Sequence, residues 1–140
     1  MASWTDSDAI EVMAIRPMPE PYTAQLTELR ALCDRMDARA TEQAPDLRDE
    51  LARGNHDFHL LVLRCAASPR LYGIAANLAR APMMRGSFQL YDSRQLGRGL
   101  QDHRELAHAI ALRDAAAARA VMEAHLRLSY LAVTTAPTQG

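Results

Sequence analysis

The 140-residue sequence contains no lysine, few aromatic residues and no long apolar run. Its 16 basic residues, all arginine, are spread along the chain and offset by 17 acidic ones. The chain therefore lacks the concentrated positive face that binds nucleic acid by charge alone. No uncharged apolar stretch approaches the roughly 20 residues that cross a bilayer, and the first residues do not resemble a signal peptide. We expect a cytoplasmic protein with no membrane partner.

Cysteine is also scarce. Cys33 and Cys65 both lie in helical patterns among apolar neighbours. A cysteine in such a position behaves as a small apolar residue, and a reducing compartment does not favour disulfides. The sequence therefore predicts two buried free thiols rather than a disulfide.

Alanine and leucine dominate, β-branched residues are sparse, and apolar positions recur at intervals of three and four residues. This period is typical of amphipathic helices, and the length suits one domain. We predict an all-α fold in three parts: a short helix with a proline-rich linker (1–21), a helical bundle (22–134) and a disordered tail (135–140). The expected helices cover residues 6–15, 22–40, 45–65, 69–91 with a bend at Pro82, 100–113 and 115–133. The stretch 92–99 has no clear pattern.

Two single residues stand out within this scheme. Gly54 lies inside the helix predicted for 45–65 and is expected to be a weak point, because glycine lowers helix propensity. Asp114 precedes the last predicted helix, where its side chain is expected to form the N-cap.

The five histidines carry the only chemistry that the sequence makes visible. Helical phase places His59, His103 and His125 on apolar faces, each on a different predicted helix. His56 and His108 fall on polar faces instead and are expected to be solvated. The sequence therefore predicts three imidazoles that point into the bundle.

A single inward histidine is more often a hydrogen-bonded core residue than a ligand. Three inward histidines are costly to bury unless each finds a partner, and one divalent cation could satisfy all of them. Nitrogen donors suit zinc, nickel, iron and manganese to different degrees. Asn55, one helical turn before His59, could add an oxygen ligand. From residue types alone, a metal site and a metal-free cluster both remain open.

The sequence also resembles a known family. The residues that carry the resemblance are Asn-His-Asp-Phe-His at 55–59, the Asp102–His103 pair, and the His125–Leu126 pair, in which His125 follows His103 by 22 residues. This pattern is similar to the FCD effector-binding domain of FadR-type regulators in the GntR family. The resemblance spans about residues 26–131, most of the chain.

The resemblance implies an antiparallel bundle of six to seven helices, a homodimer, and a divalent metal held by an aspartate and three histidines. His59, His103 and His125 match the histidine positions, and Asn55 stands where the family usually has aspartate. We expect zinc first, with nickel, iron or manganese as alternatives. Asp57 cannot replace the missing carboxylate because it points to the opposite side of the helix. The uncompensated charge of the cation would favour a bound anion.

The resemblance further implies a sensing function. A small organic acid would bind next to the metal and control DNA binding through the dimer. Arg85 is the candidate contact for its carboxylate, with Arg16 and Arg80 as weaker candidates. DNA would be bound only through a winged helix-turn-helix domain that these residues do not contain. The chain is then either a truncated effector domain or a natural stand-alone module.

Two other functions remain open. The histidines could be relics in a metal-free helical dimerisation or sensing module whose metal site has decayed. A small three-histidine metalloenzyme is disfavoured, because no inward carboxylate is expected beside the histidines to act as a general base. Asp102 and Glu105 are both expected on other faces of their helix. We therefore do not expect an enzyme.

Overall fold

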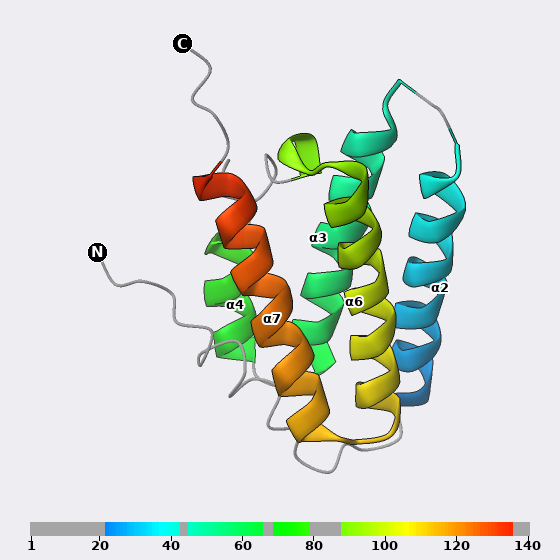
Figure 1. The fold of residues 1–140 in the computed structure, drawn as a ribbon. Coiled ribbons are helices and arrows are strands. Elements are labelled where there is room, and N and C mark those ends of the chain that lie inside the picture. Colours follow the sequence, from blue (N-terminus) through cyan, green and yellow to red (C-terminus); the bar gives the residue numbers. More distant parts are fainter. Residues whose placement is uncertain (1–21, 43–44, 66–68, 79–87, 136–140) are drawn as a thin grey trace.

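The computed structural model describes residues 22–42, 45–65, 69–78 and 88–135, and all regular structure in these ranges is helical (Figure 1). The all-α prediction is confirmed. The helix predicted at 6–15, the proline-rich linker, Pro82 and residues 136–140 lie outside the described residues. The helices are α2 (Tyr22–Ala40), α3 (Leu47–Cys65), α4 (Pro69–Leu78), α6 (Ser93–Ala111) and α7 (Ala115–Thr134), and residues 88–90 add one helical turn.

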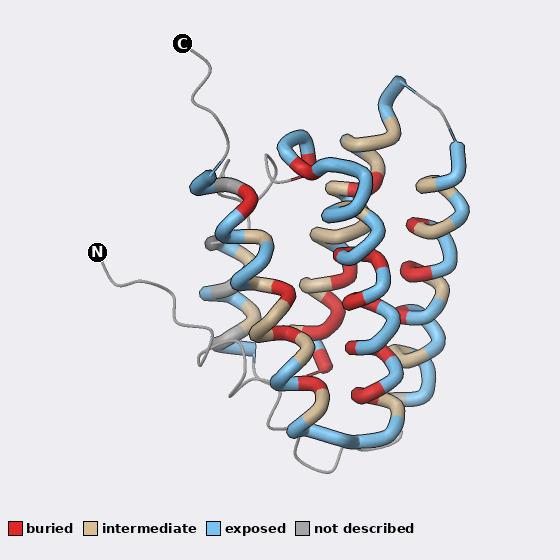
Figure 2. The backbone as a smooth tube through the Cα atoms, in the orientation of Figure 1, coloured by how far each residue is buried: buried red, intermediate tan, exposed pale blue. Residues whose placement is uncertain are grey.

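Helix α2 packs against both α3 and α6, α6 packs against α7, and α4 packs against α3. The pairs α2/α3 and α6/α7 run in opposite directions, which makes an antiparallel bundle (Figure 1). Buried residues gather on the helix sides that face one another (Figure 2). None of the described helices is both long and apolar enough to cross a membrane. The largest fully buried side chains are Phe58, Leu29, Leu51, Leu106, Ile110 and His103, so one of the six is polar.

Gly54 marks a close approach between α2 and α3 rather than a simple weak point. A Cβ atom at this position would lie 2.7 Å from Cγ of Met36, a residue that is itself buried. The absence of a side chain therefore lets Met36 pack directly over the α3 backbone. The lower helix propensity of glycine is offset by this packing.

Helix α6 begins at Ser93, so the helix predicted from residue 100 starts too late. Asp92 is the N-cap: its carboxylate accepts a hydrogen bond from the Gln95 backbone, and the Gln95 side chain accepts one from the Asp92 backbone. This is a capping box, and its spacing is readable in the sequence. The spacing of apolar residues did not reveal the start of α6, because the first part of this helix is largely exposed.

The turn between α6 and α7 fixes how these two helices meet. Arg113 adopts a φ of 57°, and the backbone N–H of Asp114 bonds to the carbonyl of Ala109. This pattern closes the end of α6 in a Schellman motif, a position where glycine is more usual. Asp114 then accepts a hydrogen bond from the Ala117 backbone, which confirms its predicted role as N-cap of α7.

Both cysteines are free and buried, as predicted. Cys33 lies in α2 and Cys65 at the end of α3. Burial raises the pKa of each thiol to about 11, so both stay protonated at neutral pH. They are packing residues in the core.

Candidate metal centre

Three histidines from three helices meet inside the bundle. His59 lies on α3, His103 on α6 and His125 on α7, and one ligand atom from each lies within 4.8 Å of the other two. His103 is 1% exposed and His125 is 6% exposed, whereas His59 is partly buried. The inward orientation predicted from helical phase is confirmed for His103 and His125, and His59 joins them from the edge of the core.

The remaining histidines separate from this cluster. His108 is exposed, as predicted. His56 is partly buried, so it is less solvated than the sequence suggested. Asp57 is exposed, in agreement with its predicted position on the opposite side of α3.

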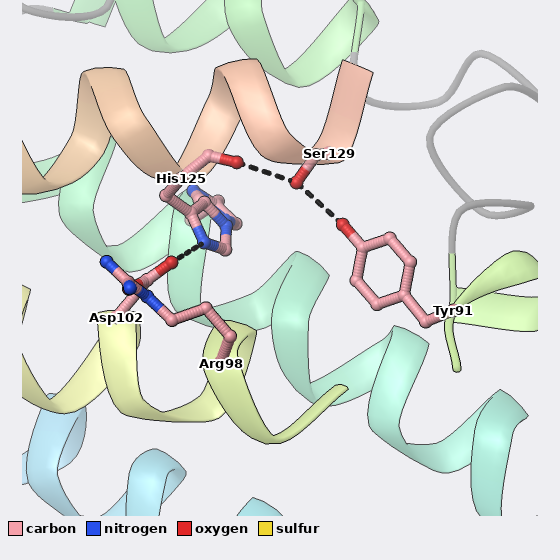
Figure 3. Close-up of polar contacts among 6 residues, drawn as sticks. Tyr91, Arg98, Asp102, His125 and Ser129 are labelled. Atoms are coloured by element: carbon pink, nitrogen blue, oxygen red, sulfur yellow. Dashed lines mark hydrogen bonds and ion pairs between the residues drawn. The ribbon is translucent and has the colours of Figure 1, made fainter. Parts of the chain in front are cut away.

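Asp102 is the main correction to the sequence-based site. It was expected on another face of its helix, but it is 2% exposed, and its Oδ2 lies 3.3 Å from Nδ1 of His125 (Figure 3). Helix α6 packs against both α2 and α7, so its buried arc is wide enough to include neighbouring positions 102 and 103. Glu105 is exposed, as expected.

Both oxygens of Asp102 are engaged. Its Oδ1 accepts a hydrogen bond of 2.7 Å from Nε of Arg98, four residues earlier on α6 (Figure 3). The sequence does contain this signal, because opposite charges spaced by four residues share one helix face. A carboxylate therefore does lie beside the histidines, but it is held in two polar contacts rather than free to move a proton.

The backbone of His125 is held by a second set of contacts. The Ser129 hydroxyl donates to the His125 carbonyl at 2.9 Å, and the Tyr91 hydroxyl donates to Ser129 Oγ at 2.7 Å (Figure 3). The carbonyl of Tyr91 in turn accepts a bond of 2.7 Å from Arg48 of α3. Ser129, Tyr91 and Arg48 were not identified from the sequence. The contacts of Tyr91 with Ser129 and with Arg48 join segments that are far apart along the chain.

His103 has no hydrogen-bond partner on either ring nitrogen among the described residues, and both nitrogens are buried. The side-chain oxygen of Asn55 is buried and unpartnered in the same way. Leaving such a group unsatisfied costs about 1–3 kcal/mol. Unprotonated imidazole nitrogen and amide oxygen are both electron-pair donors, so a cation would satisfy the Asn55 oxygen and one of the two His103 nitrogens. The donor set therefore fits a divalent metal.

Nε2 of His59 and Nε2 of His125 lie 3.3 Å apart. Two nitrogens at this distance need a proton or a cation between them. One imidazole can donate to the other, which needs no metal. Two ligands of one tetrahedral zinc, each about 2.0–2.1 Å from the ion, would be roughly as far apart.

Burial keeps His59 and His103 neutral. It lowers the pKa of His59 to about 3, and the neighbouring His125 and His56 contribute to this decrease. Burial also lowers the pKa of His103 well below its ordinary value. For Asp102, burial alone would raise the pKa, but the hydrogen bonds and charges of His125 and Arg98 outweigh it and lower the pKa. At neutral pH His59 and His103 therefore present neutral nitrogen donors, and the Asp102 carboxylate is ionised.

The predicted contacts for an organic acid cannot be placed. Arg85, Arg16 and Arg80 all lie outside the described residues.

Comparison with known proteins agrees with this architecture. The family model of the FCD domain matches residues 8–128. No curated protein and no solved structure matches the chain significantly. Because the family match covers most of the sequence, the chain belongs to the FCD domain family, the effector-binding module of GntR-family transcription regulators.

Proposed function

We propose that this chain is a metal-dependent effector-sensing domain, in which His59, His103 and His125 hold a divalent cation with Asn55 as an oxygen ligand. Zinc is the first candidate, and nickel, iron or manganese are alternatives. The main support for the proposal is that ligand atoms of three imidazoles from three helices lie within 4.8 Å of one another. The most deeply buried of these imidazoles, His103, has no hydrogen-bond partner among the described residues.

The charges around the cluster suggest the class of effector. The four proposed ligands are neutral, and the charge of Asp102 is paired with Arg98. A bound divalent cation would therefore keep most of its positive charge and offer open positions to an anion. These properties favour a small carboxylate. Arg85 remains the predicted second contact for that carboxylate.

The location of the cluster suggests how binding would be transmitted. Its histidines belong to α3, α6 and α7, so an occupied site would fix the packing of three helices at once. In a homodimer this change would alter the spacing of two attached winged helix-turn-helix domains. We assign this function to the bundle at residues 22–134.

The metal part of the proposal is tested by measuring metal content on protein purified without a histidine tag or chelator. We expect about one equivalent of a divalent metal per chain, and its loss in His103→Ala. His108→Ala is the matched control, because His108 lies on the same helix and is exposed. Equal metal content in both variants would contradict the proposal.

The effector part is tested by thermal shift with acetate, lactate and succinate at matched ionic strength. Stabilisation of the metal-loaded protein that is absent from the metal-free protein supports a carboxylate site next to the cation. Equal stabilisation of both forms would place the acid elsewhere.

A metal-free sensing or dimerisation module is the second candidate. The observation that favours it is the 3.3 Å contact between His59 and His125, which a hydrogen bond alone can explain. This function predicts no bound metal after purification and no uptake of added zinc, nickel or manganese. A carboxylate would then stabilise the protein without any cation.

A further inference from the structure

The two ring nitrogens of His125 face different neighbours. Nδ1 lies 3.3 Å from Oδ2 of Asp102, and Nε2 lies 3.3 Å from Nε2 of His59. A neutral imidazole carries one N–H and one lone pair, whereas an ionised carboxylate can only accept. Nδ1 must therefore be the donor. The lone pair of His125 is then on Nε2 and points toward the other histidines.

Asp102 is itself fixed in the orientation that this requires. Its side chain is 3% exposed, and Arg98 reaches from the surface to donate to the other carboxylate oxygen. Each oxygen thus has its own donor. The carboxylate cannot turn away from His125 without losing one of these bonds.

The contacts that hold the backbone of His125 are separate from those that hold its ring. Ser129 and Tyr91 act on the His125 carbonyl, while Asp102 contacts Nδ1 (Figure 3). Removing the carboxylate should therefore leave α7 in place but release the imidazole. This separation makes the role of Asp102 testable without unfolding the site.

We propose that Asp102 is a positioning residue of the metal centre. By accepting the Nδ1 proton of His125, it keeps Nε2 unprotonated and directed at His59 and His103. His125 is thereby held in the tautomer that can bind a cation through Nε2. Histidine ligands of metals commonly donate their second N–H to a carboxylate in this way, which increases their basicity and fixes their tautomer. The metal-binding consequence depends on the proposed function, whereas the tautomer of His125 does not.

In Asp102→Asn the new amide group could be oriented in two ways, with either its oxygen or its NH₂ group facing Arg98. Arg98 can only donate, so it selects the amide oxygen as its partner. The amide NH₂ then faces Nδ1 of His125 and forces the proton onto Nε2. The variant is nearly isosteric, yet it places a hydrogen where a metal would bind.

The first measurement is the tautomer of each histidine in metal-free protein at about pH 8, above the usual histidine pKa, by long-range ¹H–¹⁵N correlation. We expect His125 in the Nδ1–H form in the parent and in the Nε2–H form in Asp102→Asn. We also expect His59 to carry its proton on Nε2 in the metal-free parent, because the facing nitrogen of His125 is then an acceptor. An Nε2–H tautomer of His125 in the parent would overturn the proposal, and this measurement needs no variant.

The second measurement is zinc affinity by competition with a chelator. Asp102→Asn should weaken binding by about 10- to 100-fold, the usual cost of losing such a partner. Glu105→Gln is the control, because it removes the same charge from an exposed position on the same helix and should change affinity less than about twofold. Equal affinities for the parent and Asp102→Asn would overturn the proposed positioning role. If the parent bound no zinc, the proposed metal function would fail, and the tautomer comparison would still decide whether Asp102 orients His125.

Discussion

The buried residues of α2 and α3 are apolar and closely packed, whereas α6 and α7 also contain buried polar residues. Leu29 and Leu51 are completely or almost completely buried on the first side, and Gly54 allows Met36 to approach the backbone. All three buried polar residues of the described part, Asp102, His103 and His125, lie on the second side. The difference suggests that one side of the fold supplies stability while the other accepts a cost in order to bind.

The largest expected effect comes from the apolar side. Leu29→Ala should lower the free energy of unfolding by about 2–5 kcal/mol, because it leaves a cavity in a fully buried position. Chemical denaturation measures the loss. If the apolar side contributes stability independently of the metal site, the folded variant should keep its zinc affinity within about twofold of the parent. A large loss of affinity would show that the two sides are not independent.

The next effect is a pH dependence that originates on the polar side of the metal-free protein. Burial lowers the folded-state pKa of His59 to about 3 and that of His103 well below its usual value, whereas both titrate near 6.5 when unfolded. Above pH 6.5 both histidines are unprotonated in the folded and in the unfolded state, so their burial does not lower the free energy of unfolding there. As pH falls from 6.5 toward 3, only the unfolded state takes up these protons.

Stability should therefore fall by roughly 1 kcal/mol per pH unit for each of the two histidines. Denaturation of metal-free protein at a series of pH values measures this slope. Leu29→Ala should shift the whole curve without changing the slope, whereas His103→Leu should reduce it by about one proton. A curve that is flat between pH 6.5 and 5 would contradict the burial of neutral histidines.

Gly54→Ala should destabilise the protein by about 1–3 kcal/mol, because the new Cβ would meet Met36 at 2.7 Å. Gly97→Ala is the matched control. Gly97 also lies in a helix, but nothing lies within 4 Å of a Cβ there, so this change should stabilise the protein by up to about 1 kcal/mol. Thermal or chemical denaturation separates the two. The same sign for both variants would mean that helix propensity, and not the α2–α3 contact, determines the effect.

The smallest effect should appear on the polar side and have the opposite sign. His103→Leu replaces an unpartnered buried imidazole with an apolar side chain and should stabilise the metal-free protein by about 1–2 kcal/mol. The same variant should lose metal. Stability and metal content measured on one sample test both outcomes, and a destabilised metal-free variant would show that His103 contributes to the core in its own right.

The sequence predicted the features that follow from the spacing of apolar residues within a single helix. Helical phase was sufficient to predict that His103 and His125 point into the bundle and that His108 points outward, because each helix has a distinct apolar face. Local capping is also encoded in the sequence. Asp114 is the N-cap of α7, as predicted, and the capping box of α6 is formed by Asp92 and Gln95, whose spacing is present in the sequence.

The features that were missed depend on how helices pack. Asp102 is one position from His103, and only the position of α7 shows that it is buried beside His125. The close approach at Gly54 likewise requires Met36 from another helix. Both errors arose because a single helix, read alone, does not show how wide its buried arc is.

The central claim is that three imidazoles form one metal site, and X-ray absorption on zinc-loaded protein tests it most directly. We expect nitrogen and oxygen ligands at about 2.0–2.1 Å from the zinc, with outer-shell scattering from three imidazoles. In His103→Ala this scattering should decrease to that of two imidazoles or disappear. A shell that contains sulfur at about 2.3 Å, or oxygen ligands without imidazole scattering, would contradict it.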